Sequence, residues 1–83
     1  MPLTELKQAR NRSVGSKQTK KAIEKGTALK VYIARDAETH VTTPLIDMCK
    51  DKGIEIVYID EMRTLGEACG IQVGAASAAI VSV

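Results

Sequence analysis

The sequence predicts an α/β fold, a three-layer α/β/α sandwich around a mixed sheet of about four strands. Apolar, β-branched segments at residues 29–34, 54–59 and 75–83 alternate with segments whose apolar residues recur at helical spacing. The 83 residues, with 45% hydrophobic and 27% charged side chains, suit one domain with one modest core. Strands that alternate with helices at short intervals bury both faces of a sheet under helices.

Two helices are predicted in the first part of the chain. Leucines at helical spacing predict a short helix over residues 3–10, and residues 12–15 form a short extended segment. Ser16 belongs to a residue type that caps helices, so we expect a second helix over residues 17–25. Gly26 ends this helix, since glycine readily adopts the left-handed conformation that follows a helix.

A buried strand and a third helix occupy the middle of the chain. Residues 29–34 (LKVYIA) are predicted to form the strand, and the acidic turn at residues 36–38 follows it. Pro44 suits an early helical position, and Gly53 closes the helix. The inner face of this helix is predicted to consist of Leu45, Ile46, Met48 and Cys49.

The last part of the chain is predicted to be strand, helix and strand. Residues 54–59 form the next strand, and apolar spacing predicts a fourth helix over residues 61–69. Gly70 ends this helix, whereas Gly66 inside it is expected to weaken it mildly. An apolar, alanine-rich strand follows over residues 75–83.

Basic side chains are concentrated in the first part of the chain. The net charge is only +2, but residues 1–30 carry eight basic and two acidic side chains, a net charge of +6. Residues 31–83 carry four basic and eight acidic side chains, a net charge of −4. Clustered positive charge favours a polyanionic partner, because each neutralised phosphate releases condensed counterions. A solvated helix face with no partner is the alternative.

The cysteines indicate neither a zinc site nor a disulfide framework. Cys49 and Cys69 stand alone, without a CxxC pair or a histidine at ligand spacing. We expect both to be core thiols in a reducing compartment, and we expect no metal and no cofactor. The N-terminus lacks an apolar signal region and no stretch reaches the length of a membrane span. We therefore expect a cytoplasmic monomer with no membrane partner.

Few reactive groups are available for catalysis. The single histidine, His40, lies near a predicted helix start and beside no nucleophile motif. The GxSxG, HExxH, Walker A and GxGxxG motifs are absent. Asp36 and Glu38 follow a strand, where α/β folds place functional groups, yet a capping or turn role is expected for at least one of them. We therefore predict a protein without catalytic residues.

The start of the second predicted helix is the first candidate binding element. Stacking of single-stranded bases is disfavoured, because Tyr32 and Tyr58 are the only aromatic residues and both lie in strands predicted to be buried. Gly15 permits close approach of a ligand to the backbone, and the free N–H groups of residues 16–18 favour phosphate. Further positive charge comes from Lys17, Lys20 and Lys21. The alternative is an ordinary capped amphipathic helix.

A second candidate element is the loop at residues 70–74. Ile71, Gln72 and Val73 lie between two glycines, directly before the final strand. Polar residues are normal in such loops, so exposed apolar side chains here indicate contact with a ligand. The alternative is that Ile71 and Val73 fold back into the core.

Two segments carry a family resemblance. They are GSKQTKKAIEKG at residues 15–26 and LGEACGIQVGAA at residues 65–76, and the second is the more specific because an apolar loop before an alanine-rich strand is uncommon. Both resemble the L7Ae/L30e family of archaeal and eukaryotic ribosomal and snoRNP proteins, in its short bacterial form. The resemblance covers nearly the whole chain, from Leu6 to Val81.

Members of that family bind kink-turns, in which a short bulge followed by sheared G·A pairs bends an RNA duplex. The resemblance implies that Gln18 reads guanine edges, with Lys17 beside it and Lys21 reaching a base or a phosphate. Gly15 and Ser16 would contribute backbone contacts at the helix start.

The resemblance also implies roles at the other loops. Ile71, Gln72 and Val73 would support the bulged nucleotides, and Glu38 would face the hydrogen-bonding edge of an extruded base. The chain departs from the family at positions 17 and 18, where Lys-Gln replaces the usual Asn-Glu. Because an amide oxygen accepts hydrogen bonds less strongly than a carboxylate, we expect affinity to depend more on electrostatics than in the archaeal relatives.

The predicted function is non-enzymatic binding of structured RNA, a kink-turn in ribosomal RNA, a riboswitch or another RNA, with the ribosome as a candidate partner. The alternative is a ribosome-associated structural protein that contacts ribosomal RNA or ribosomal proteins without kink-turn specificity. A small hydrolase or methyl-transfer accessory is a more distant alternative, since the sequence lacks a reactive triad and a cofactor loop.

Overall fold

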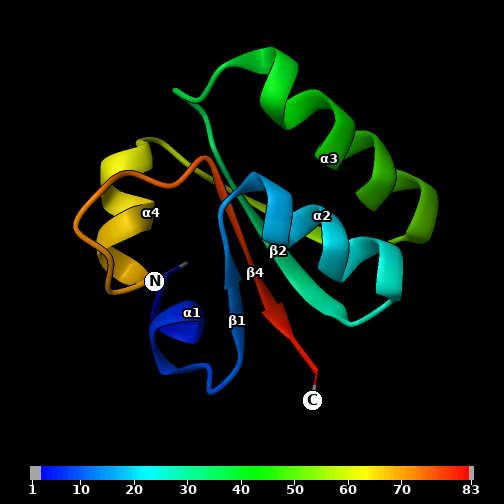
Figure 1. Cartoon of the computed structure of the whole chain (residues 1–83), viewed down its shortest axis with the longest axis horizontal. Coiled ribbons are helices and arrows are strands. Elements are labelled where there is room, and N and C mark those ends of the chain that lie inside the picture. Colours follow the sequence, from blue (N-terminus) through cyan, green and yellow to red (C-terminus); the bar gives the residue numbers. More distant parts are fainter. Residues whose placement is uncertain (1–2, 83) are drawn as a thin grey trace.

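The computed structural model describes residues 3–82 and alternates helices with strands throughout this range (Figure 1). The elements are, in order, α1 (Thr4–Gln8), β1 (Arg12–Val14), α2 (Ser16–Lys25), β2 (Ala28–Ala34), α3 (Thr39–Lys52), β3 (Glu55–Ile59), α4 (Met62–Ala68) and β4 (Ser77–Val81). Each helix and strand predicted from the sequence is present, with ends that differ by a few residues. Position 83 of the predicted last strand lies outside the described residues.

The strands form one mixed sheet in the order β1-β4-β2-β3. β2 and β3 are parallel, whereas β4 is antiparallel to both of its neighbours, β1 and β2. The carboxyl ends of β1, β2 and β3 therefore lie at the same edge of the sheet as the amino end of β4. The connections that follow the first three strands, and the loop that precedes β4, meet at this edge (Figure 1).

Helices cover both faces of the sheet, which confirms the three-layer α/β/α sandwich. Side chains of successive strand residues point to opposite faces. Val31 and Ile33 accordingly pack with α2 and α3, in a cluster that includes Ile23, Leu45 and Cys49. Tyr32 and Ala34 pack on the other face, with Leu6 of α1 and Leu65 of α4.

The second helix begins differently from the sequence-based prediction. Gly15 is its N-cap and Ser16 is already the first helical residue, with no hydrogen bond from a capping side chain. The prediction that Ser16 caps the helix is therefore wrong. Gly15 has φ 93° and ψ 157°, a conformation that only glycine adopts without strain, so the backbone turns into the helix one residue earlier.

Pro44 lies inside α3 and not near its start, because the helix begins at Thr39. Proline has no N–H group, so the carbonyl of His40 lacks its usual helical hydrogen bond. The side chains of both residues are exposed, which places the interrupted bond on the solvent side of the helix. The proline is tolerated there because it does not disturb the buried face formed by Thr42, Leu45 and Cys49.

Both cysteines are free and buried, as predicted. Burial raises the pKa of the Cys49 thiol, and it also raises the pKa of the Cys69 thiol, where nearby Arg12 offsets part of the effect. Both groups are therefore protonated and shielded near neutral pH, although the thiolate is the reactive form. We expect thiol-specific reagents such as DTNB to react slowly with the native protein and rapidly in denaturant. Rapid labelling of the native protein would contradict the burial of these side chains.

Candidate nucleic-acid interface

The two predicted binding elements lie beside each other at the sheet edge described above. The Gly15 N–H donates to the carbonyl of Ser77 at 2.8 Å, which joins the start of α2 to the start of β4. The Ala34 N–H donates to the carbonyl of Ala76 at 2.9 Å, which joins the end of β2 to the residue before β4. Ser77 is fully buried, so this junction is part of the core. Residues 15–18 and 71–73, which are distant in sequence, therefore lie on segments that meet at the same edge of the sheet (Figure 1).

The first turn of α2 presents backbone donors at this surface. Its first helical hydrogen bond runs from the Thr19 N–H to the Gly15 carbonyl at 2.9 Å. The preceding N–H groups of the turn have no helical acceptor, and the helix dipole places partial positive charge there. Thr19 and Ile23 are buried, so Lys17 and Gln18 on the opposite side of the helix face solvent. The turn suits an anionic group.

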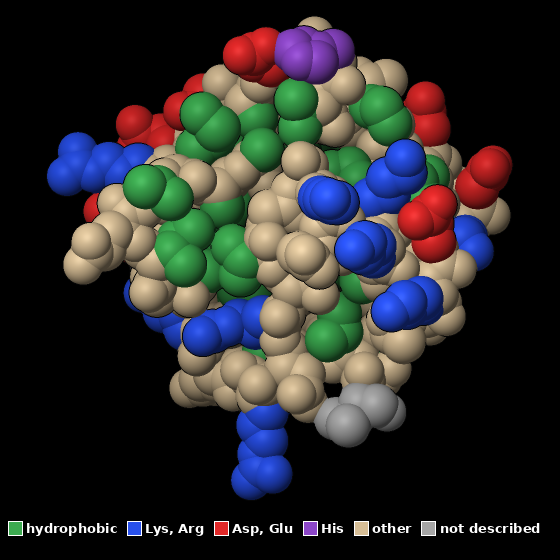
Figure 2. All heavy atoms as spheres, in the orientation of Figure 1, with side chains coloured by type: hydrophobic (Ala, Val, Ile, Leu, Met, Phe, Trp, Pro, Cys, Tyr) green, Lys and Arg blue, Asp and Glu red, His purple; other side chains and the backbone are tan. Residues whose placement is uncertain are grey.

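Positive charge continues along α2. Figure 2 shows Lys and Arg side chains grouped over this helix, with hydrophobic side chains on the same face, over the loop before β4. The lysines of α2 are all exposed, and they are Lys17, Lys20, Lys21 and Lys25. The other basic side chains of residues 1–30 do not all join them. Lys30 pairs with Glu5 and Glu55, and Arg12 donates to the carbonyl of Leu6.

The loop before β4 is held at both ends by backbone hydrogen bonds. The Ile71 N–H donates to the Gly66 carbonyl at 3.1 Å, and the Ala75 N–H donates to the Met62 carbonyl at 3.0 Å. Ile71 packs partly against the core, whereas Val73 is 71% exposed. Each of the two alternatives for this loop therefore applies to one residue, since Ile71 folds back and Val73 faces solvent. Gln72 is exposed between them.

Gly66 is required by the approach of this loop to α4. An ideal Cβ on Gly66 would lie 2.0 Å from the carbonyl oxygen of Val73. The prediction that Gly66 mildly weakens the helix is therefore incomplete, because the absence of its side chain is what allows the loop to pack there. The loss of helix propensity is the cost of a rigid, close-packed loop.

The two acidic residues after β2 have different roles. The Asp36 carboxylate accepts the N–H of Met62, the first residue of α4, at 2.7 Å. The expected capping role is thus confirmed for this residue. Glu38 is the N-cap residue of α3 but makes no capping hydrogen bond, and its carboxylate lies 3.2 Å from Nδ1 of His40. Both Glu38 and His40 are exposed, so this carboxylate is open to a ligand.

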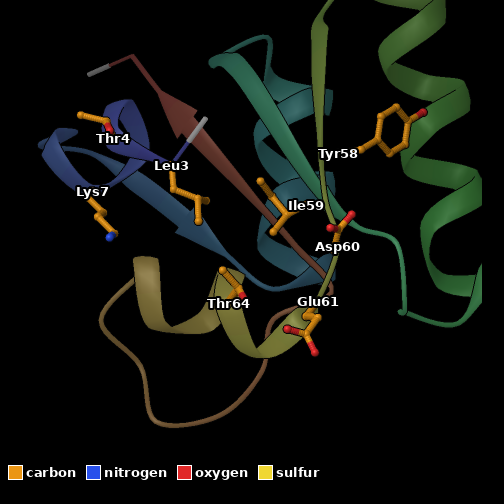
Figure 3. A pocket seen from close by; sticks show the side chains of 8 residues that line it. All are labelled: Leu3, Thr4, Lys7, Tyr58, Ile59, Asp60, Glu61 and Thr64. Carbon is orange, nitrogen blue, oxygen red and sulfur yellow. The ribbon is translucent and has the colours of Figure 1, made fainter. Parts of the chain in front are cut away.

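A shallow hollow of about 310 Å³ continues the surface between α2 and α3. It is lined by Lys17 and Lys20 of α2 and by Val41 and Pro44 of α3. The sequence did not indicate these two α3 residues, because their proximity to α2 depends on how the helices pack. A larger hollow of about 400 Å³ lies between α1 and the end of β3 and is lined by none of the predicted RNA-binding residues (Figure 3).

Residues 3–82 contain no group of three or more His, Cys, Asp or Glu side chains arranged to hold a metal ion. Among these residues, no helix has the length and apolar character needed to cross a membrane.

Comparison with known proteins places the chain in a family. Residues 2–83 match the model of the Ribosomal protein L7Ae/L30e/S12e/Gadd45 family. The chain is 56% identical over 70 residues to the RNA-binding protein TTE2299 of Caldanaerobacter subterraneus subsp. tengcongensis, which covers 84% of this chain and 85% of that protein. It is 45% identical over 80 residues to the RNA-binding protein BH0128 of Halalkalibacterium halodurans, which covers 96% and 98% of the two chains.

A solved structure agrees with this assignment. The structure of a Giardia lamblia 15.5kD RNA binding protein superposes with a TM-score of 0.83 and 30% sequence identity. The match covers 98% of this chain and 69% of the Giardia chain. The family model, the bacterial relatives and the shared architecture lead to one conclusion: the chain belongs to the Ribosomal protein L7Ae/L30e/S12e/Gadd45 family.

Proposed function

We propose that the chain is a non-enzymatic RNA-binding protein that recognises and stabilises kink-turns in ribosomal, riboswitch or other structured RNA. The observation that carries this proposal is the hydrogen bond between Gly15 and Ser77, which joins the start of α2 to the start of β4, shortly after the loop at residues 70–74. One small surface thereby combines helix N–H groups, lysines and an exposed valine. The RNA-binding relatives named above support the nucleic-acid partner.

Each part of the surface suits a different part of a bent, bulged RNA. The exposed amide of Gln18 can hydrogen-bond to guanine edges of the sheared G·A pairs. Lys20 and Lys21 attract the phosphates of the flanking stem. Val73, which is 71% exposed, provides an apolar contact for a bulged nucleotide, and the open carboxylate of Glu38 can accept hydrogen bonds from an extruded base.

The experiment compares a kink-turn RNA with the same RNA in which Watson-Crick pairs replace the sheared G·A pairs. We expect tighter binding of the kink-turn at every salt concentration, because only the bent form brings the bulge and the stem to one surface. Fluorescence anisotropy across a salt series measures both affinities. Equal affinities would favour the alternative of a ribosome-associated structural protein without kink-turn specificity.

Gln18→Ala tests the assigned base contact. We expect it to reduce kink-turn affinity by about 2- to 10-fold, the range expected for one hydrogen bond, and to reduce the preference over the Watson-Crick RNA by the same factor. Gln8→Ala is a matched control, because Gln8 is an exposed glutamine on α1, which covers the opposite face of the sheet. If Gln18→Ala leaves the preference unchanged, the amide does not read the sheared pairs.

A further inference from the structure

Tyr58 is exposed, although its apolar strand predicts that it is buried. Its exposed fraction is 42%, because β3 is an edge strand with β2 as its only neighbour in the described sheet. Figure 3 shows the ring directed away from Ile59, on the α3 side of the strand. The guanidinium carbon of Arg35 lies over this ring, 5.0 Å from its centroid. The two side chains therefore form an exposed cation–π pair.

Arg35 contacts the end of β3 through its backbone and its side chain. Its backbone N–H donates to the carbonyl of Ile59 at 2.7 Å, which holds the residue beside the end of β3. Its Nε lies 3.7 Å from Oδ1 of Asp60, and its guanidinium carbon lies over the ring of Tyr58. The side chain is nevertheless 62% exposed. The guanidinium is a flat group that is accessible to solvent, and unpaired RNA bases stack on groups of this type.

This pair lies at the same sheet edge as the candidate interface. Arg35 directly follows β2, and Glu38 follows three residues later. Tyr58 and Asp60 mark the end of β3, which is parallel to β2. At the usual spacing of strands, the end of β3 lies roughly 14 Å from the end of β1, across three strand-to-strand steps. An RNA held at the start of α2 and beside Glu38 can therefore continue to Arg35.

The charges around Arg35 favour a nucleobase over a phosphate. Asp36, Asp60 and Glu61 are exposed acidic residues at the same edge, and Asp60 already faces the guanidinium. This environment repels the phosphate backbone, whereas it can accept hydrogen bonds from the exocyclic amino groups of a base. The lysines of α2, by contrast, contribute to RNA binding mainly by attracting phosphates.

We infer that Arg35 and Tyr58 form a stacking site for an unpaired nucleobase of the bound RNA, outside the contacts assigned to the kink-turn itself. The inference rests on the proposed function, since it requires RNA at this edge. It adds stacking on the Arg35 guanidinium to the contacts of the site. Recognition would then extend to single-stranded nucleotides that flank the bent duplex.

The first test compares a kink-turn RNA with blunt stems and the same RNA with a short unpaired adenosine extension on either strand. We expect the extension on one strand to raise the affinity by about 5-fold or more, as stacking of one base does elsewhere. Arg35→Ala and Tyr58→Ala should remove this gain and leave binding of the blunt RNA unchanged. Arg35→Lys should also remove it, because lysine keeps the charge but has no plane to stack on.

The salt dependence separates stacking from charge. Arg35→Ala should leave the slope of log affinity against log salt unchanged, whereas Lys20→Ala should make it shallower by about 0.7 to 0.9. If Arg35→Ala flattens the slope as Lys20→Ala does, Arg35 contacts a phosphate and the inference is overturned. Thermal denaturation of each variant confirms that the exposed substitutions leave the fold intact.

Tyrosine fluorescence gives an independent readout. The chain has two tyrosines and no tryptophan, so Tyr32→Phe leaves Tyr58 as the only residue that fluoresces when tyrosine is excited selectively. This background is suitable because the buried hydroxyl of Tyr32 has no hydrogen-bond partner among the described residues. We expect the extended RNA to quench Tyr58 emission and the blunt RNA to leave it largely unchanged. Equal emission with both RNAs overturns the stacking site.

The two proposals fail in different ways. If the wild-type chain distinguishes a kink-turn from its Watson-Crick counterpart but gains nothing from either extension, the stacking site is wrong and the proposed function stands. If it binds the kink-turn and the Watson-Crick RNA equally, the proposed function fails, whatever the extensions do. Loss of the extension effect in Arg35→Ala, with kink-turn discrimination retained, supports both.

Discussion

Gly66→Ala is expected to destabilise the fold and to weaken RNA binding strongly. The new Cβ would lie 2.0 Å from the carbonyl oxygen of Val73 and 3.1 Å from the Cα of Gly74, and both are backbone atoms that cannot rotate away. Either the loop or α4 must move, and overpacking of this kind costs about 1–3 kcal/mol of the free energy of unfolding, or more. Chemical denaturation followed by circular dichroism measures this loss.

Glu67→Ala is the matched control for this substitution. Glu67 is the next residue of α4, and it is exposed, with a 3.4 Å ion pair to Arg63 as its main contact. We expect this change to alter stability by less than about 0.5 kcal/mol, as is usual for an exposed ion pair one helical turn apart. Equal stability of the two variants would show that the loop does not pack against Gly66 as described.

Gly15→Ala is expected to reduce both stability and kink-turn affinity. The φ of 93° and ψ of 157° lie in a region that is essentially restricted to glycine, so the substitution should cost about 1–3 kcal/mol of the free energy of unfolding. Relief of this strain would move the Gly15 N–H away from the Ser77 carbonyl. The start of α2 and the loop before β4 would then no longer be aligned for one RNA. Denaturant titration and kink-turn binding measure the two effects.

Gly26→Ala separates the loss of stability from the loss of kink-turn affinity, because Gly26 lies at the opposite end of the same helix. It has φ 76° and ψ 18°, and an added Cβ would meet nothing within 4 Å. This left-handed conformation costs a non-glycine residue about 1–2 kcal/mol, a loss similar to that expected at Gly15. We expect Gly26→Ala to retain kink-turn affinity at temperatures where it is folded. If both variants lose affinity equally, stability and not the local geometry at Gly15 explains the loss.

Elements with strong local patterns could be predicted from the sequence. The strand at residues 29–34 is rich in apolar and β-branched side chains, and the structure places β2 at Ala28–Ala34. The helix over residues 17–25 was bounded by glycines and is present as α2. The prediction of α3 was less accurate, because Pro44 is a typical first-turn residue. The tertiary packing of the buried face of α3 extends this helix five residues further toward the N-terminus.

Features that depend on sheet order could not be predicted. Tyr58 lies in an apolar strand, and its exposure follows only from the edge position of β3. The role of Gly66 depends on a backbone contact with a loop seven residues later. A capping or turn role was expected for at least one of Asp36 and Glu38, but no local pattern could show that Asp36 caps α4, 26 positions later. In each case the deciding contact is made in the folded state between segments that are separate in sequence.

In the candidate site, too, local features could be predicted from the sequence, whereas contacts between distant segments could not. The motifs at residues 15–18 and 71–73 were recognisable individually, because a glycine before a helix and an apolar loop are local signals. Their proximity depends on the position of β4 between β1 and β2. The lysines were predicted to form one basic region. Lys30 does not add free charge to that region, because it forms ion pairs with acidic residues of α1 and β3. Whether each of these residues contacts RNA stays a prediction.

The central position of β4 also has a consequence for biosynthesis. β1 pairs with β4 in the described sheet, and Arg12 lies opposite Ile80, so this pairing joins residues made at very different times during translation. Closing such a long segment of chain is slow compared with forming local structure. While β4 is still inside the ribosome, Gly15 has no Ser77 carbonyl to bind, and the two halves of the surface are unconnected. On the proposed function, a nascent chain should therefore acquire RNA specificity only after β4 has emerged.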